Sequence, residues 1–225
     1  KWLCRQRMLE ANPASELELP KRGKSLPKDT LSIPEVEAVL GAPDITNPLG
    51  LRDRAMLETF YTCGIRRTEL TRLILGDLNL DNGTLFIRQG KGGNDRVVPV
   101  GNRALSWIRK YLDEVRPILM DGPGQQGLFL SSFGCPFRPD SLSRLVVRYL
   151  KAADIGRKKG GCHLLRHACA THMLEGGADI RYIQHLLGHA NLDTTAIYTQ
   201  VSIHKLKVIH AGSHPAENTA QRPSH

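Results

Sequence analysis

Apolar residues recur every three to four positions along most of the chain, which is the spacing of amphipathic helices. The first predicted helix follows Ser32, where Glu35 three residues later and a proline in the first turn form a capping-box pattern, and it ends at Gly41. A second helix is predicted over residues 51–61, with Gly64 as the glycine that ends it.

A third helix is predicted to begin near Arg66–Arg67, because leucine and isoleucine side chains follow at helical spacing. Beyond residue 100 the same spacing returns in five separate stretches. These predicted helices cover residues 103–115, 140–152, 163–174, 180–187 and 202–209.

Between these helical stretches the pattern changes to strict alternation. Residues 78–80 and 85–87 alternate around Asn82-Gly83, a dipeptide typical of tight hairpin turns. Residues 96–100 form a third apolar stretch after a glycine-rich turn that has Lys91 near its tip. The sequence therefore predicts a mainly α fold with one small three-stranded antiparallel sheet (α+β).

The same pattern divides the chain into three parts. Residues 1–30 look like the end of a helix followed by a proline- and lysine-rich linker without periodicity. Residues 31–211 contain the predicted helices and strands and form the main domain. Residues 212–225 are polar and contain proline, so we expect a disordered tail. The chain starts with lysine, which suggests a fragment or a processed product.

Composition adds a preference for an anionic partner. The 225 residues include 31 Lys and Arg against 22 Asp and Glu, a net charge of +9, and the isoelectric point is about 9.5. This suits a polyanion, although a merely soluble basic surface gives the same numbers. No apolar run approaches the roughly 20 residues that span a bilayer, so we expect no membrane partner. Five cysteines without a C-x-x-C pair or a secretory signal favour a reducing cytoplasm.

All nine histidines lie at or after His163, which raises the possibility of a metal site. The spacing of His163 and His167 can place two ligands on one helix face. The glutamate of zinc-protease motifs is missing, however, and Arg166 would repel a cation. Hydrogen-bonded core histidines at 167, 172 and 185 are the simpler interpretation.

Several cations instead occur where an anion can bind. His163 and Arg166 are three residues apart and share a helix face, and Arg66 stands at another helix start, where unpaired backbone N–H groups favour anions. Lys91 lies in a glycine-flanked turn, and Tyr198 follows a Thr-Thr pair. Taken singly, each has an ordinary explanation as a surface or core residue.

Taken together and in order, four segments resemble the tyrosine recombinase (integrase) family, and most of all its Xer-like bacterial members. The segments are Cys63-Gly64-Ile65-Arg66-Arg67-Thr68-Glu69-Leu70, Gly90-Lys91-Gly92-Gly93-Asn94-Asp95-Arg96-Val97-Val98-Pro99, His163-Leu164-Leu165-Arg166-His167, and Leu187-Gly188-His189 through Tyr198-Thr199. The resemblance extends over about residues 12–215 and implies the catalytic-domain fold of that family. It also implies that residues 1–30 are the end of a missing N-terminal core-binding domain plus its linker.

The resemblance implies a phosphate-binding set. Arg66 and Arg166 match the arginine pair that clamps the scissile phosphate, and His189 matches the position that bonds a phosphate oxygen. Glu69 matches an acidic position that supports the arginine. Cations aimed at the phosphate stabilise the charge that develops in the transition state.

The resemblance also implies a nucleophile and its proton-transfer groups. Tyr198 matches the nucleophile, Lys91 the hairpin lysine that protonates the leaving 5′-oxygen, and His163 the histidine that assists proton transfer. A covalent protein–DNA link conserves the phosphodiester energy, so strands can be rejoined without ATP. With this cationic set neither a metal nor another cofactor is required.

Double-stranded DNA carrying a specific recombination site is the implied partner. Arg144 and Arg148 share the face of the 140–152 helix opposite its apolar stripe, and the corresponding family helix enters the major groove. Arg96, Lys158 and Lys159 are further candidate phosphate contacts.

The resemblance implies that four subunits act together on two duplexes through a Holliday junction. The helix at 202–209 is expected to dock on a neighbouring subunit, with ordinary packing on its own chain as the alternative. Arg67 and Cys162 depart from the usual pattern; packing is the simpler role for Cys162. Type IB topoisomerase-like relaxation and catalytically silent DNA binding remain alternatives, and we expect a bacterial-type cytoplasmic, nucleoid-associated protein.

Overall fold

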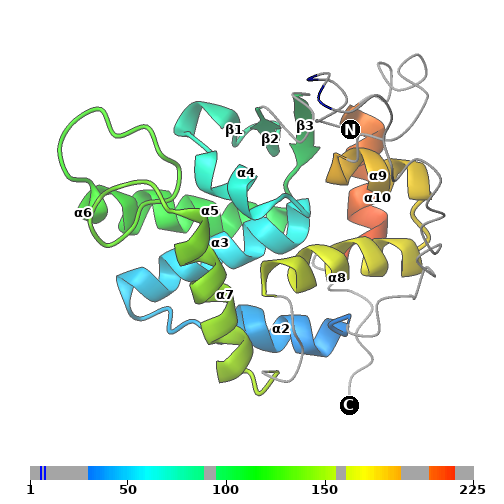
Figure 1. Ribbon diagram of the computed structural model, residues 1–225, viewed down its shortest axis with the longest axis horizontal. Coiled ribbons are helices and arrows are strands. Elements are labelled where there is room, and N and C mark those ends of the chain that lie inside the picture. The colour runs from blue at the N-terminus through cyan, green and yellow to red at the C-terminus, as the bar shows by residue number, and fades with distance from the viewer. Residues whose placement is uncertain are drawn as a thin grey trace.

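Figure 1 presents the computed structural model, a mostly helical protein with one small sheet. The structure describes residues 6, 8, 30–88, 95–155, 161–188 and 203–215, with side chains of the last segment described from residue 207. The helices there are α2 (Ile33–Gly41), α3 (Pro48–Cys63), α4 (Arg67–Arg72), α5 (Asn102–Glu114), α6 (Arg116–Leu119), α7 (Pro139–Ala152), α8 (Cys162–Glu175), α9 (Ile180–Leu187) and α10 (Ile203–Ser213). The expected fold class, mainly α with a three-stranded antiparallel sheet, is confirmed.

Helix α3 is the centre of the fold. Its residues from Gly50 to Cys63 are buried except for the half-buried Arg54, and it contacts α2, α4, α5 and α8. The Asn47 side chain caps its start by accepting the Leu49 N–H at 2.8 Å. Gly64 ends it in the left-handed conformation, with φ of 55°. The glycine therefore turns the chain directly toward α4.

The sheet has the order β1-β2-β3, with all pairs antiparallel. Its strands are β1 (Leu78–Asn79), β2 (Thr84–Ile87) and β3 (Arg96–Pro99), preceded by a 3₁₀ turn at Leu75–Asp77. Leu85 pairs with Val98 and Ile87 with Arg96, and these four side chains are buried. Arg96 thus shares the inward face of the sheet with apolar residues.

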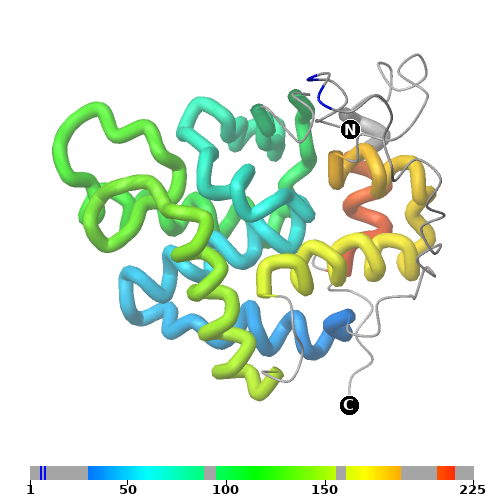
Figure 2. Tube along the Cα trace, in the orientation of Figure 1, coloured from blue at the N-terminus to red at the C-terminus, as the bar shows by residue number. Residues whose placement is uncertain are grey.

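Segments far apart in the sequence pack together. Helix α8 contacts α2 and α3, and α7 contacts α2, α4 and α8 (Figure 2). Helix α10 packs on β3 and α8 of the same chain. It continues to Ser213, and His214 after it is fully buried, so the predicted disordered tail is wrong for residues 212–215. Because the His214 side chain packs in the core, residues 212–215 have a defined conformation at the end of α10.

The one-turn helix α6 was not predicted. Its Arg116 is buried and donates to the carbonyls of Gln125 at 2.6 Å and Gly127 at 2.8 Å. These contacts across a loop, rather than periodicity, fix the turn. Within the described ranges, no helix combines the length and apolar character needed to cross a membrane.

Candidate active site

Arg66 is placed by the junction between α3 and α4. It is the N-cap residue of α4, and its backbone N–H donates to Glu69 at 2.8 Å, while its guanidinium pairs with the same carboxylate at 2.8 Å. A Cβ atom on Gly64 would lie 3.0 Å from Leu187 and 3.1 Å from the Cys169 sulfur. Glycine therefore allows α3 to end directly against α8 and α9, which brings Arg66 to the end of α9.

Arg166 approaches the same place from α8. It is half-buried, and its guanidinium donates to the carbonyl of Gly64 and, at 2.7 Å, to that of Leu187. Burial, together with the charge of Arg66, lowers the pKa of Arg166 to about 10. The group still carries its charge at neutral pH. His163 lies three residues earlier on α8, hence on the same side of the helix, and is exposed.

Three arginines hold the C-terminal end of α9. Arg96 donates to the carbonyl of Leu186 at 3.0 Å, Arg166 to that of Leu187 at 2.7 Å, and Arg66 to that of Gly188 at 2.7 Å. The last carbonyls of a helix have no partner within the helix and carry partial negative charge, so cations stabilise them. The residue after Gly188 in the chain is His189.

Glu69 connects two of these arginines. Each of its oxygens accepts from Arg96, at 3.0 and 2.8 Å, in addition to the two bonds from Arg66. Burial acts to raise the pKa of Glu69, but the hydrogen bonds and charges of the arginines outweigh it and lower the pKa to about 2. Glu69 is therefore an anion that orients cations, and it is not available as an acid near neutral pH.

Arg96 differs from its expected place. Its side chain is 6% exposed and is enclosed between Glu69 and the end of α9, so it is not disposed as a surface phosphate contact. The alternation of β3 contained this information, because Arg96 and Val98 share one face and Val98 is buried.

Helix α7 presents only part of its expected basic face. Arg144 is exposed and contacts Ser141 at 3.3 Å. The Arg148 side chain is 64% exposed, but one of its nitrogens is paired with Asp53 of α3 at 2.8 Å. Arg67, which the sequence left unexplained, donates to Ser143 at 3.0 Å and so bridges α4 to α7.

The structure brings together Arg66, Glu69, Arg96 and Arg166 around the end of α9, with His163 on the same side of α8. Arg144 and Arg148 lie on α7, as described above. The remaining candidate residues lie outside the described residues, and these are Lys91, Lys158, Lys159, His189 and Tyr198.

The buried histidines and cysteines have packing roles. His172 is buried and hydrogen-bonded to the Tyr61 hydroxyl at 2.9 Å, as expected of a core histidine. Burial raises the pKa of the Cys162 thiol, which disfavours the reactive thiolate. Over the part of the chain that the structure describes, no group of three or more His, Cys, Asp or Glu is arranged to hold a metal ion.

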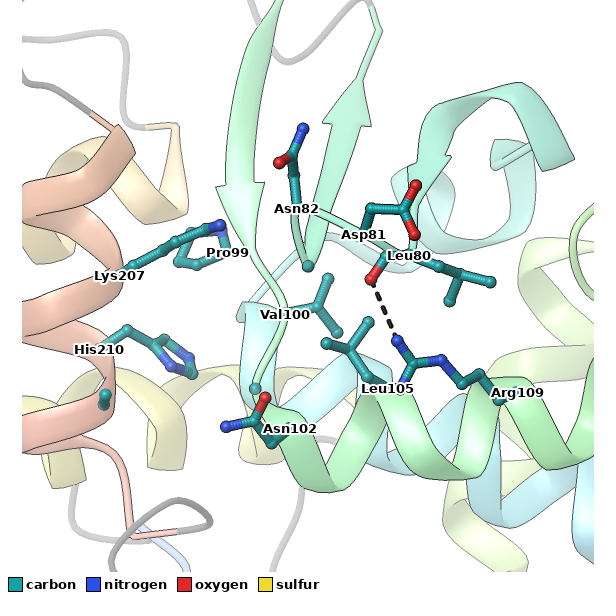
Figure 3. A pocket seen from close by; sticks show the side chains of 13 residues that line it. Leu80, Asp81, Asn82, Pro99, Val100, Asn102, Leu105, Arg109, Lys207 and His210 are labelled. Carbon is teal, nitrogen blue, oxygen red and sulfur yellow. Dashed lines mark hydrogen bonds between the residues drawn. The ribbon is translucent and has the colours of Figure 1, made fainter.

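A pocket lies away from this cluster, between α10, the β1–β2 turn and the start of α5 (Figure 3). Lys207 and His210 line it from α10, and Arg109 donates to the Leu80 carbonyl on its other side at 3.2 Å. Of the predicted catalytic residues that the structure describes, Arg66, His163 and Arg166, none lines it.

Two arginines converge from α4 and α8 beside a third held in the sheet, and such a group of guanidiniums has the charge and the N–H donors that suit an anion. The chain belongs to the phage integrase family, whose sequence model matches residues 30–204. It is 53% identical over 216 residues to "Tyrosine recombinase XerC 2" of Ralstonia nicotianae (strain ATCC BAA-1114 / GMI1000), covering 96% of this chain and 62% of that protein. The chain thus spans less than two thirds of that relative's length.

Solved structures agree with this family. The crystal structure of XerA recombinase matches with a TM-score of 0.66 and 32% identity, over 92% of this chain and 68% of that one. The XerH site-specific recombinase bound to its difH substrate in a pre-cleavage complex matches with a TM-score of 0.64 and 27% identity, over 83% of this chain and 55% of that one.

Proposed function

We propose that this chain is the catalytic part of a site-specific DNA recombinase, with residues 31–211 as its DNA-breaking and rejoining domain. The observation that carries the proposal is the convergence of Arg66 and Arg166 on adjacent carbonyls at the end of α9. The family membership and the similarity to named tyrosine recombinases support it. The similar XerH protein is described as a site-specific recombinase bound to its difH substrate, which supports double-stranded DNA with a specific site as the partner of this chain.

The arginine pair acts on the scissile phosphate. A phosphodiester carries one negative charge, and its pentavalent transition state concentrates more charge on the non-bridging oxygens. Arg66 and Arg166 each have further N–H groups beyond those used on the backbone, and these bond the two oxygens. Because Glu69 and the protein backbone fix the guanidiniums beforehand, little reorganisation is needed during the reaction.

The Tyr198 oxygen attacks the phosphorus, and the bond from phosphorus to the 5′-oxygen breaks. This leaves a 3′-phosphotyrosine and a 5′-hydroxyl. His163 assists removal of the phenol proton, Lys91 gives a proton to the leaving 5′-oxygen, and His189 bonds a phosphate oxygen. In the second half of strand exchange, a 5′-hydroxyl of the partner duplex attacks the phosphotyrosine and releases Tyr198. Each step replaces one phosphoester bond with another, so the energy of the phosphodiester is kept in the phosphotyrosine and rejoining needs no ATP. The cationic side chains take the place of a metal ion in this proposal.

DNA is held by the basic face beside this site. Arg144, exposed on α7, is proposed to contact the duplex directly. Arg148 is proposed as a second contact, made by the exposed part of its guanidinium while one nitrogen stays paired with Asp53. Lys158 and Lys159 complete the proposed phosphate contacts.

Four subunits on two duplexes exchange strands through a Holliday junction in this proposal, and α10 passes to a neighbouring subunit. In the single chain α10 packs in cis, with His210 donating to the Thr62 carbonyl at 2.7 Å. The same surface of a neighbour can accept the helix. Deleting residues 202–225 then impairs tetramer assembly more than DNA affinity, while equal loss of both indicates that α10 serves only its own chain.

The test is covalent capture of DNA. A pool of duplexes with randomised sequence around a central nick is incubated with the chain in EDTA and without ATP, denatured, and the protein-bound strands are sequenced. The proposal expects adducts linked through the 3′-phosphate and enriched in one sequence, and none with Tyr198→Phe. A second duplex and a supercoiled plasmid distinguish the outcomes, because relaxation of the plasmid without joining of strands to the second duplex would indicate topoisomerase-like chemistry. Absence of any adduct, with DNA still bound, would indicate a silent DNA-binding protein.

A further inference from the structure

We propose that Arg96 is a positioning residue for the reaction: its buried guanidinium holds Glu69 and the end of α9 in one arrangement, and thereby fixes Arg66 and the start of the segment that carries His189. The inference rests on the proposed function and adds to it a residue that does not touch DNA.

The first observation is the saturation of Glu69. A carboxylate has about four lone-pair positions, and Glu69 accepts four hydrogen bonds, two from Arg66 and two from Arg96. The two bonds from Arg96 form a parallel fork at 3.0 and 2.8 Å, the geometry in which arginine fixes a carboxylate most firmly. Without Arg96, half of these bonds are lost, and the carboxylate can rotate together with the Arg66 side chain.

The second observation is the contact of Arg96 with α9. Its Nε donates to the Leu186 carbonyl at 3.0 Å, so one planar group binds Glu69 with one edge and α9 with the other. Gly188 lies directly against it, since a Cβ atom there would be 2.9 Å from the guanidinium carbon. Arg96 therefore fixes the position of the C-terminal end of α9 relative to the sheet, and His189 is the residue that follows Gly188 in the chain.

The third observation is the position of Arg96 in the hairpin. It begins β3 and pairs with Ile87, the last residue of β2, so it lies where the described strands flank the segment of the chain that contains Lys91. Through Arg96 the hairpin, α4 and α9 share one rigid connection. The burial of this guanidinium, at 6% exposure, excludes a direct phosphate contact in this arrangement and distinguishes it from Arg66 at 22%.

The first test is independent of catalysis. The carboxyl carbon of Glu69 is followed by NMR during a pH titration of the 225-residue chain and of Arg96→Gln. The expected result is that Glu69 titrates at a clearly higher pH in the variant, because the fork that favours the anion is gone. An unchanged titration would overturn the proposal, and this holds whether or not the protein cleaves DNA.

The second test measures cleavage on a nicked duplex recovered by covalent capture. We expect Arg96→Gln to lower the single-turnover cleavage rate by about 100-fold, since misplacement by about 1 Å has effects of this size. DNA affinity should change by less than about twofold, because a group that makes no phosphate contact adds nothing to the electrostatic binding term. The matched control is Arg88→Gln, which removes an exposed arginine that follows β2 and pairs with the buried carboxylate of Asp77 at 2.7 Å, and it should leave the rate unchanged.

Two further comparisons separate positioning from other roles. Arg96→Lys keeps the positive charge and is expected to be more thermally stable than Arg96→Gln. One ammonium cannot form the two parallel hydrogen bonds of the guanidinium, so cleavage by this variant should remain slow. Full recovery of the rate by lysine would overturn the proposal.

A duplex with sulfur at the leaving 5′-position needs no acid, because a thiolate leaves unprotonated. The defect should persist on it; its disappearance would assign Arg96 to the placement of Lys91 and overturn the route through Glu69 and α9. If the unaltered chain forms no adduct at all, the proposed function fails, and the Glu69 titration still decides whether Arg96 holds the cluster.

Discussion

The buried contact between α10 and the core should make the protein sensitive to mild acid. His214 is fully buried after α10, stacked on His210 at 4.8 Å and edge-on to Tyr61 at 4.5 Å. Burial lowers the pKa of His214 well below its ordinary value of 6.5, and the nearby His210, Arg103 and His172 act in the same direction. The folded protein therefore keeps this imidazole neutral at pH values where the unfolded chain protonates it.

The sign and size of the effect follow from linkage. Because the unfolded state binds more protons below pH 6.5, stability is retained above that pH and is lost as the pH falls. A histidine that stays neutral in the folded state lowers the free energy of unfolding by about 1.4 kcal/mol at pH 5.5 relative to pH 7.5, from RT ln(1 + 10). Burial lowers the pKa of His172 as well, so it adds to the loss. The carboxylate of Glu69, with a pKa of about 2, stays ionised across this range and does not contribute.

The assay is urea unfolding at pH 7.5, 6.5 and 5.5. The chain should lose at least about 1.4 kcal/mol of unfolding free energy over this range, and His214→Phe, which keeps an aromatic ring in the site, should lose correspondingly less. His163→Phe, which replaces an exposed histidine, is the control and should keep the slope of the unaltered chain. An equal slope in His214→Phe, or stability independent of pH in the unaltered chain, would refute the reasoning.

Three other changes have defined outcomes. Gly188→Ala should destabilise the protein by about 1–2 kcal/mol and lower adduct formation, because φ is 63° and the new Cβ would press on Arg96; unchanged denaturation would show that the end of α9 adapts. Arg67→Ala should change the unfolding free energy by less than about 1 kcal/mol, because its contacts to Asp140 and Ser143 are at the surface; a larger loss in urea would mean that the bridge to α7 is structural. Arg144→Ala should reduce the salt dependence of DNA binding by about one in the log–log slope; an identical slope would remove Arg144 from the DNA contacts.

Local rules predicted most helices because their ends are encoded locally. The capping box of Ser32 and Glu35 is present as expected, Gly64 adopts the left-handed end of α3, and α9 has the predicted bounds Ile180–Leu187. These features depend on neighbours within four residues in the chain, so a single sequence contains them.

The misses arise from contacts that join distant segments. Helix α6 forms because Arg116 bonds to carbonyls of a loop that follows, and α10 continues past residue 212 because His214 finds a place in the core. The partner of Arg148 is Asp53, 95 residues away. No periodicity in the sequence contains such pairings, since they depend on how the helices pack.

The site shows the same division. Family resemblance named Arg66 and Arg166 from local motifs, and the structure places both guanidiniums on adjacent carbonyls at the end of α9. The way in which Arg96 and Glu69 join them to the end of α9 required three segments to be placed in space. The charge of Arg96 makes it a candidate phosphate contact, whereas its alternation with Val98 in the strand favours the buried place that the structure shows.

The central claim is that Arg66 and Arg166 form one phosphate site at the end of α9. The most direct measurement is a structure of Tyr198→Phe bound to the nicked duplex recovered by covalent capture. Both guanidiniums should lie within hydrogen-bond distance of the non-bridging oxygens of the same scissile phosphate, with Glu69 still bonded to Arg66 and Arg96. A scissile phosphate that contacts neither arginine, or only one of them while the other stays on the backbone carbonyls, would contradict the claim.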